Sequence, residues 1–286
     1  MAVWKKYEDI VVLLIDNGAD VNIRNIMGSS PLLDATYGGQ ERIVALLIEK
    51  GADVNAKSTS GQTALLSASR WGHTAIAKLL IDNGAELNAA TNLGDTPMSW
   101  AAGYGHLEIV QLLIDNGADI PDSALAKAAY MGKTAVVELL LNNGANVDAE
   151  ESGRTVLMLA AWFRREDVVT LLLESGANVD TSNGYGQTAL SMAVWGGNAN
   201  IVEKLLSFEA DVNKQNNDGW TALMRAARSN RKDIVVLLID NGAEINLTNK
   251  SGKTAEELAR KCGFTEVADI IKEAGKFGYG LMVWFG

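Results

Sequence analysis

The feature that most constrains this chain is a short motif that recurs at a nearly fixed spacing along most of its length. Most neighbouring copies lie 33 residues apart, although the step from Gly117 to Gly144 is 27. Glu209-Ala210 stands once in place of the motif, and Gly275 continues the series without the alanine. A period of this length is typical of solenoids, in which each unit buries its apolar face only by stacking on its neighbours. The motif, Gly-Ala, occurs at Gly18, Gly51, Gly84, Gly117, Gly144, Gly176 and Gly242.

A second motif, Gly-x-Thr, follows most of the Gly-Ala copies after about nine residues. Its threonine predicts the N-cap of a short helix, because a hydroxyl there can accept a hydrogen bond from a free backbone N–H. A tight turn and a second helix such as "IVQLLI" follow, and Gly ends that helix as a left-handed C-cap. The copies begin at Gly61, Gly94, Gly153, Gly186, Gly219 and Gly252, with Ser in place of Thr after Gly28.

These units resemble the ankyrin repeat, which has a 33-residue period and a Thr-Pro-Leu-His signature. The resemblance covers about residues 1–276. It implies an all-α solenoid in which each repeat has a β-hairpin finger and two antiparallel helices, with a concave face made by the fingers and the first helices. The histidine of the signature is absent, so the hydrogen bonds that it makes in the family are not expected here. Its position holds Leu33, Leu66, Ser99, Ala126, Met158, Ser191 and Met224.

The period divides the chain into about eight stacked repeats after an N-terminal half repeat. The segment that follows Gly117 is too short to build a finger, which leaves either lost contacts or a notch for a bulky ligand. The final residues, 277–286, are rich in aromatic residues, and we expect them to dock on the closing repeat or in the concave groove. The predicted units are a half repeat 1–24, repeats 25–57, 58–90, 91–120, 121–149 (without its finger), 150–182, 183–215 and 216–248, a capping repeat 249–276, and the tail 277–286.

The composition of the chain excludes several classes of function. The 286 residues carry a formal net charge of −10, which disfavours general nucleic-acid binding. Cys262 is the single cysteine, so an intrachain disulfide is not possible. We find neither a signal peptide nor an apolar run long enough to span a bilayer. These observations predict a cytoplasmic protein that does not bind membranes.

The sequence offers few groups for catalysis. His73 and His106 hold equivalent turn positions and have no cysteine or carboxylate cluster with metal-ligand spacing. The "GKT" strings at Gly132 and Gly252 lack the preceding glycine that a phosphate-binding loop needs. We therefore expect no catalytic residue, no metal and no cofactor.

The residues that differ between repeats indicate where a partner binds. Two adjacent positions at the end of each first helix face the concave groove in ankyrin proteins, and in this chain they often hold aromatic residues or Arg. Such residues are enriched in binding hot spots. In "LAAWFRRED" (159–167) two rings fill both positions and two arginines replace the usual Gly-His turn. The candidate partner-binding residues are Tyr37, Arg70, Trp71, Tyr104, Tyr130, Trp162, Phe163, Arg165, Tyr185, Trp195, Trp220 and Arg228, with Arg154 as a further finger-tip candidate.

We therefore expect a non-catalytic scaffold or adaptor that is a monomer when free and binds a protein or peptide carrying acidic and apolar groups. Three alternatives stay open. The rings could instead pack against one another and fill gaps between repeats. The groove could recognise a small or nucleotide-like ligand, because rings stack on bases and Arg binds phosphate. The chain could also be an engineered binder on this scaffold, although its framework positions vary more than a designed consensus would.

Overall fold

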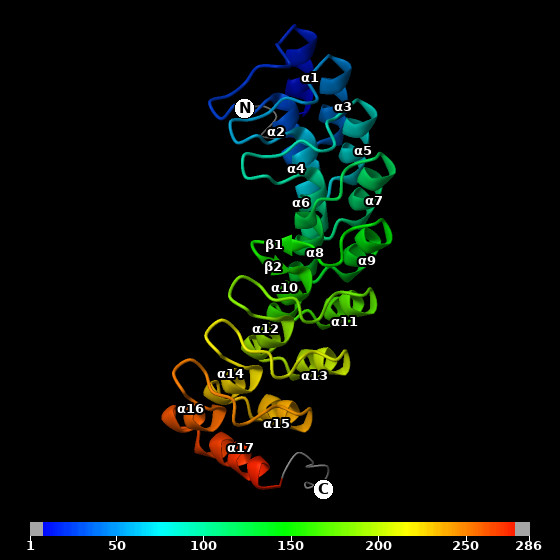
Figure 1. Cartoon of the computed structure of the whole chain (residues 1–286). Helices are drawn as coiled ribbons and strands as arrows, with labels where there is room; N and C mark the ends of the chain where they lie inside the picture. Colours follow the sequence, from blue (N-terminus) through cyan, green and yellow to red (C-terminus); the bar gives the residue numbers. More distant parts are fainter. Residues whose placement is uncertain (1–7, 278–286) are drawn as a thin grey trace. The chain divides into compact units, whose positions relative to one another are not determined.

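The computed structural model describes residues 8–277, and these residues form two compact units. The first unit extends to Ala128 and includes Ala135–Ala145, and the second contains Ala129–Thr134 and everything from Asn146 onward. Both units are made almost entirely of short helices in pairs (Figure 1). The expected docking of the tail concerns residues 278–286, which lie outside the described part, and Phe277, the last residue of the final helix.

In the first unit, the first helices of successive pairs pack on one another, as α2·α4 and α4·α6 do. The second helices form a parallel row through α3·α5 and α5·α7. α8 passes from the first unit into the second. The helices are α1 (Glu8–Asp16), α2 (Pro31–Tyr37), α3 (Glu41–Glu49), α4 (Ala64–Trp71), α5 (Thr74–Asp82), α6 (Pro97–Tyr104), α7 (Leu107–Asp115), α8 (Asp122–Met131) and α9 (Thr134–Asn142).

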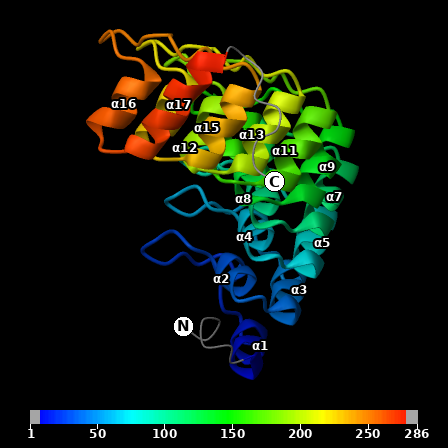
Figure 2. The same ribbon diagram turned by 90° about the horizontal axis from the view of Figure 1, so that it is seen from below.

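The second unit repeats this arrangement. Its first helices α10, α12, α14 and α16 pack in sequence, and its second helices α11, α13, α15 and α17 lie side by side (Figure 2). The elements are β1 (Glu150–Glu151), β2 (Arg154–Thr155), α10 (Val156–Trp162), α11 (Glu166–Glu174), α12 (Ala189–Gly196), α13 (Ala199–Ser207), α14 (Ala222–Arg228), α15 (Lys232–Asp240), α16 (Ala255–Lys261) and α17 (Thr265–Phe277).

Alanine lets the first helices approach closely. Ala160, Ala193, Ala226 and Ala259 recur at the repeat spacing, and each is fully buried. A methyl group at this position fills the space between stacked helices without separating them, and larger residues such as Leu157 and Leu190 close the core beside it. The stacked first helices therefore form a rigid layer from which the side chains at the helix ends project.

The helix termini agree with the sequence prediction. Thr63, Thr96, Thr155, Thr188, Thr221 and Thr254 are N-caps whose hydroxyls accept a hydrogen bond from the backbone N–H three residues later. The position of the missing signature histidine is filled in two ways. Ser99 and Ser191 complete capping boxes with their N-cap threonines, while Leu66 and Met224 are buried in the core.

The connections between helix pairs are mostly turn loops rather than hairpins. Within residues 8–277, β1 and β2 are the only assigned strands, paired antiparallel with Glu150 opposite Thr155. The other loops are held by backbone bonds such as Ser58 N–H to Gln62 O at 2.9 Å. Neighbouring loops are linked by amide side chains, as where the Asp53 N–H donates to Asn22 Oδ1 at 2.8 Å. Only residues 116–121 connect α7 to α8, so that connection has no finger.

Candidate functional site

Two indole rings from successive repeats form the centre of a cluster in the second unit. Trp162 ends α10 and Trp195 lies near the end of α12, and their rings stack with centroids 5.7 Å apart and planes 15° apart. Each indole also has a guanidinium over its ring: Arg154 lies 4.8 Å from the Trp162 centroid, and Arg225 lies 4.4 Å from that of Trp195. Stacking and cation–π contacts therefore fix the positions of all four side chains.

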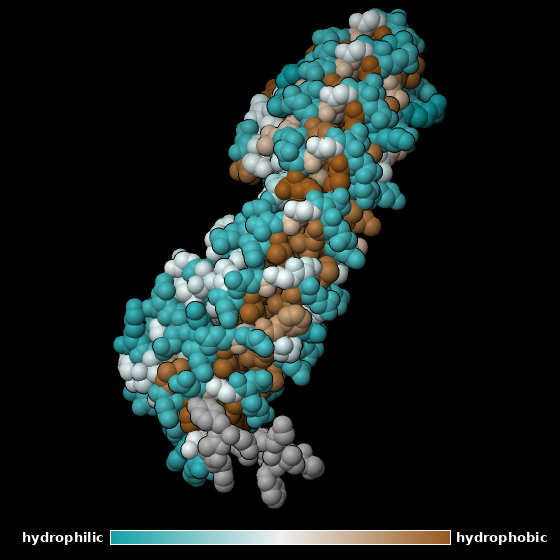
Figure 3. Space-filling model, turned by 45° about the vertical axis from the view of Figure 1, so that its right-hand side comes forward, coloured by the Kyte–Doolittle hydropathy of each residue, from teal (hydrophilic) through white to brown (hydrophobic). Residues whose placement is uncertain are grey.

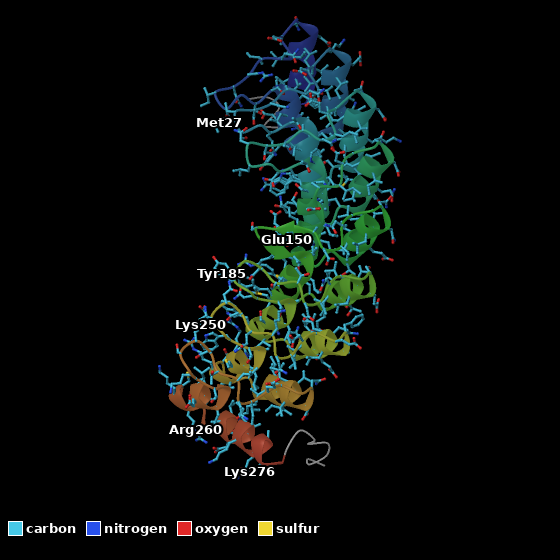
Figure 4. The ribbon with its side chains drawn as sticks, in the orientation of Figure 1. Met27, Glu150, Tyr185, Lys250, Arg260 and Lys276 are labelled. Carbon is cyan, nitrogen blue, oxygen red and sulfur yellow. The ribbon has the colours of Figure 1, made fainter. Side chains whose placement is uncertain are left out.

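These side chains line an open hollow of about 590 Å³, which we call the C-terminal pocket. Tyr185, which lies in the loop before α12 and is labelled in Figure 4, is 71% exposed and lines the hollow. Trp220, in the next loop, has the guanidinium of Arg228 at 5.3 Å from its centroid. Arg154, Trp162, Tyr185, Gln187, Trp195, Asn216, Asp218, Trp220, Arg225, Arg228 and Ser229 line the pocket.

The C-terminal pocket carries an excess of positive charge. Arg154, Arg225 and Arg228 line it, whereas Asp218 is its single acidic residue. Among residues 8–277, none of the ion pairs involves these three arginines. Burial lowers the pKa of Arg225 from its usual value, and the nearby positive charge of Arg228 lowers it further. The pocket therefore presents cationic groups in excess over its one carboxylate, and no ion pair among the described residues engages them.

A turn next to the pocket explains the two arginines of "LAAWFRRED". Arg164 has a positive φ of 60°, the left-handed conformation that Gly72 and Gly105 adopt in other repeats. Arg165 Nε donates to the backbone O of Tyr130 at 2.8 Å, just as a ring nitrogen of His106 bonds to the O of Arg70 at 3.1 Å. Arg165 thus joins neighbouring repeats through its backbone contact.

The second ring of that segment extends the aromatic row within the second unit. Phe163 lies 6.2 Å from Trp162 and 5.5 Å from Tyr130, measured between ring centroids, and it is 48% exposed. Both of its ring contacts come from residues that the sequence placed on the partner-binding surface. The row of rings beside the C-terminal pocket is therefore Tyr130, Phe163, Trp162 and Trp195.

A related group, the N-terminal cluster, lies in the first unit. Tyr37 meets Trp71 edge-on with centroids 5.3 Å apart. The guanidinium of Arg70 lies 5.4 Å from the Trp71 centroid and 4.5 Å from that of Trp100. Tyr104 stacks on Trp100 at 5.6 Å. Aromatic rings and a guanidinium group are thus in contact in this cluster, as they are in the C-terminal pocket. The N-terminal cluster consists of Tyr37, Arg70, Trp71, Trp100 and Tyr104.

The comparison with known families agrees with this geometry. A family model described as ankyrin repeats in three copies matches residues 1–91, 57–123, 99–183 and 177–249. The chain belongs to the ankyrin repeat family. No curated protein matches it. Ankyrin repeats generally act as protein–protein interaction modules and are generally not catalytic.

The sequence analysis did not identify one position of the ankyrin repeat that contributes side chains to the two clusters. Trp100, Lys127 and Arg225 hold the same place in three repeats, three residues before the first of the two groove positions. Residues at that spacing share a helix face, so these side chains reach the clusters. Other repeats have Ser67 or Met192 there, both buried. The available signal was a Trp, Lys or Arg at a position that holds the buried Ser67 and Met192 in other repeats.

Lys127 occupies this position in the repeat that lacks a finger, and its side chain packs against neighbouring residues. Its stem lies over Gly103, where an added Cβ would sit 3.2 Å from Lys127 Cβ. Its ammonium group pairs with Asp95 and lies 4.7 Å from the Trp100 centroid. Both partners of the ion pair are largely buried. Lys127 therefore belongs to the packing around Trp100 rather than to an open cationic surface.

Other surfaces of the described residues offer less chemistry. No group of three or more His, Cys, Asp or Glu residues in the described part could hold a metal ion, and no described helix is long and apolar enough to cross a membrane. The second helices α5, α7 and α9 line an open hollow of about 680 Å³ that includes Ala75, Leu107 and Leu139. In Figure 3, which colours the surface by hydropathy, apolar residues lie between polar residues on the face that is shown. That hollow lacks the joined rings and cations of the two clusters.

Proposed function

We propose that this ankyrin repeat protein is a non-catalytic scaffold or adaptor that binds a protein or peptide through the ends of its first helices and the adjoining loops. The observation that carries the proposal is the C-terminal pocket, where exposed rings and guanidinium groups in excess over the one carboxylate lie together. Aromatic residues and Arg are the residue types that dominate binding energy at protein interfaces. The expected partner has acidic and apolar groups.

The candidate residues divide between the two units. The N-terminal cluster contributes Tyr37, Arg70, Trp71 and Tyr104, and the C-terminal unit contributes the remaining candidates: Tyr130, Trp162, Phe163, Arg165, Tyr185, Trp195, Trp220 and Arg228. Of these, Arg165 is engaged in a backbone contact, so we expect it to contribute less to binding than the exposed rings. We propose about eight repeats after a half repeat, a monomeric free state and a cytoplasmic location.

A second candidate function is recognition of a small anionic or nucleotide-like ligand in the same pocket. The hollow of about 590 Å³ is within the usual size range of ligand sites. Base stacking needs accessible ring faces, however, and those of Trp162 and Trp195 contact each other and two guanidinium groups. The net charge of −10 also opposes polyanions at long range. These observations favour a protein or peptide.

An affinity-capture comparison tests the proposed function. The wild-type protein and a Phe163→Ala, Tyr185→Ala double variant serve as baits, since both rings are exposed candidate binding residues. Phe208→Ala is the matched control, because Phe208 is an exposed ring of the same unit outside the pocket. We expect the double variant to lose specific partners that wild type and the control retain. Equal recovery by all three baits would refute the proposed surface.

A further inference from the structure

The excess positive charge in the C-terminal pocket indicates what part of a partner it recognises. Arg225 and Arg228 lie one helical turn apart on α14, and neither has a carboxylate partner among the described residues. Two guanidinium groups of like charge, one of them partly buried, are stabilised when an anion binds between or beside them. The lowered pKa of Arg225, caused first by burial and then by Arg228, agrees with this reasoning.

The indole rings hold these cations in place instead of neutralising them. A guanidinium stacked on a ring uses its flat face, while its N–H groups point outward in the guanidinium plane. Arg225, over Trp195, and Arg228, over Trp220, donate no side-chain hydrogen bond to another described residue, so their N–H donors are available for a ligand. Because the stacked Trp162 supports Trp195 from the neighbouring repeat, binding requires little reordering of these side chains.

The aromatic lining of the pocket favours a peptide over an isolated anion. Tyr185 is 71% exposed, and Trp220 lies in the next loop, which is joined to the first by a hydrogen bond from the Asn217 N–H to Tyr185 O. Both rings belong to the lining, so apolar groups next to a bound carboxylate would contact them. An inorganic anion would leave the exposed Tyr185 ring without a contact. An acidic residue with apolar neighbours in an extended chain uses both the cations and the rings.

We propose that the C-terminal pocket is a carboxylate receptor that recognises an acidic peptide segment. The guanidinium groups of Arg225 and Arg228 bind an Asp or Glu carboxylate of the partner, and Tyr185 and Trp220 contact its apolar neighbours. Arg154 adds positive charge at the opposite end of the indole stack. This inference rests on the proposed function and assigns the specificity of the site to its arginines rather than to its stacked indoles.

The test is an unbiased selection of short peptides from a random library displayed on phage, with the full chain as target. Synthetic versions of the selected peptides are then measured by fluorescence polarisation against wild type, Arg225→Gln, Arg228→Gln and Lys272→Gln. Arg228 is exposed, so we expect the fold to tolerate its substitution. Lys272→Gln removes the same charge on α17, away from the pocket. Circular dichroism verifies that each variant is folded.

We expect selected peptides to contain Asp or Glu beside apolar residues, and to bind each arginine variant more than about tenfold more weakly than wild type. Lys272→Gln should bind as wild type does, and peptides with Gln in place of the acidic residue should lose affinity. Raising the salt concentration should weaken binding modestly, since few charges are involved.

Other results would overturn the inference in distinguishable ways. Neutral apolar peptides whose binding depends on Tyr185 and not on the arginines would refute the carboxylate receptor and leave the proposed function intact. Acidic peptides that bind the arginine variants normally would refute it as well. Tighter binding of a single-stranded oligonucleotide or of inorganic phosphate, with the same arginine dependence, would replace the peptide by another anion. Failure to select any peptide would overturn the carboxylate receptor, while the proposed function is tested separately by the affinity-capture comparison.

Discussion

The Trp162–Trp195 pair gives the sharpest test of how the C-terminal pocket is built. From the sequence, each alanine substitution is expected to weaken binding and to leave stability nearly intact. The structure changes this expectation for stability. Trp162 is mostly buried, Trp195 is 51% exposed, and the two rings stack on each other and on two guanidinium groups. Removing either ring therefore takes away packing as well as a contact surface.

The magnitude follows from burial and stacking. A fully buried Trp→Ala change costs about 3–5 kcal/mol, so we expect about 2 kcal/mol for Trp162→Ala and about 1 kcal/mol for the more exposed Trp195→Ala. A stacked aromatic pair contributes about 0.5–1.5 kcal/mol beyond area burial. The free energy of unfolding of the double variant should therefore fall by about 1 kcal/mol less than the two single effects added together.

The assay is urea denaturation of wild type, both single variants and the double variant, followed by far-ultraviolet circular dichroism. The slopes of the four transitions should agree, so that the differences report stability alone. Additive single effects would refute the stacked pair. An unchanged midpoint for Trp162→Ala would refute its burial and restore the interpretation of that ring as a free binding group.

Three further changes test the local structure. Glu209 adopts a left-handed φ of 62° where most repeats have Gly, so Glu209→Gly should raise the free energy of unfolding by about 0.5–1 kcal/mol in thermal or urea melts; a lower value would mean that the residue is not strained. Hydrogen bonds from Asn198 and then Asn200 lower the pKa of Glu166 below its usual value. Because the folded-state pKa of Glu166 is the lower one, ionised Glu166 stabilises the folded protein above the usual carboxyl pKa, and this stabilisation is lost as pH falls through the folded-state pKa. The Asn198→Ser variant, which keeps an N-cap hydroxyl, should raise the pKa of Glu166 in an NMR titration. An unshifted titration would contradict those hydrogen bonds. Ser99→Ala removes a capping-box side chain and should cost about 1 kcal/mol of unfolding free energy in a urea melt, whereas a neutral effect would show that the box is dispensable.

The sequence predicted those features that depend on local chemistry. Threonine N-caps and left-handed helix ends follow from the residues at one position and their neighbours. Glu209, which replaces the Gly that ends the helix in other repeats, has the left-handed conformation expected at that position. The finger prediction was less successful outside β1 and β2, because turn loops meet the same backbone hydrogen-bonding needs without strands. The repeat period showed which helices stack on one another. It did not show how many residues in each loop form strand pairs.

Features that depend on contacts between repeats were harder to predict. The sequence placed Trp162 and Trp195 at equivalent positions, yet whether they face a partner or each other depends on side-chain orientations that a period does not specify. Arg225 was overlooked because the sequence reasoning followed only the two positions at the end of each first helix, and Arg225 lies three residues before the first of them. Its partial burial and its contact with Trp195 arise from residues more than one element apart.

The most direct test of the central claim is site-specific photo-crosslinking. A benzophenone amino acid replaces Tyr185 in the lining of the C-terminal pocket in one protein, and Val236, which is exposed on the second helix α15, in another. After irradiation with a captured partner or a selected peptide, the account predicts a covalent adduct from position 185 and none from position 236. An adduct from position 236 alone, or equal yields from both positions, would show that the partner does not bind through the first helices and their loops.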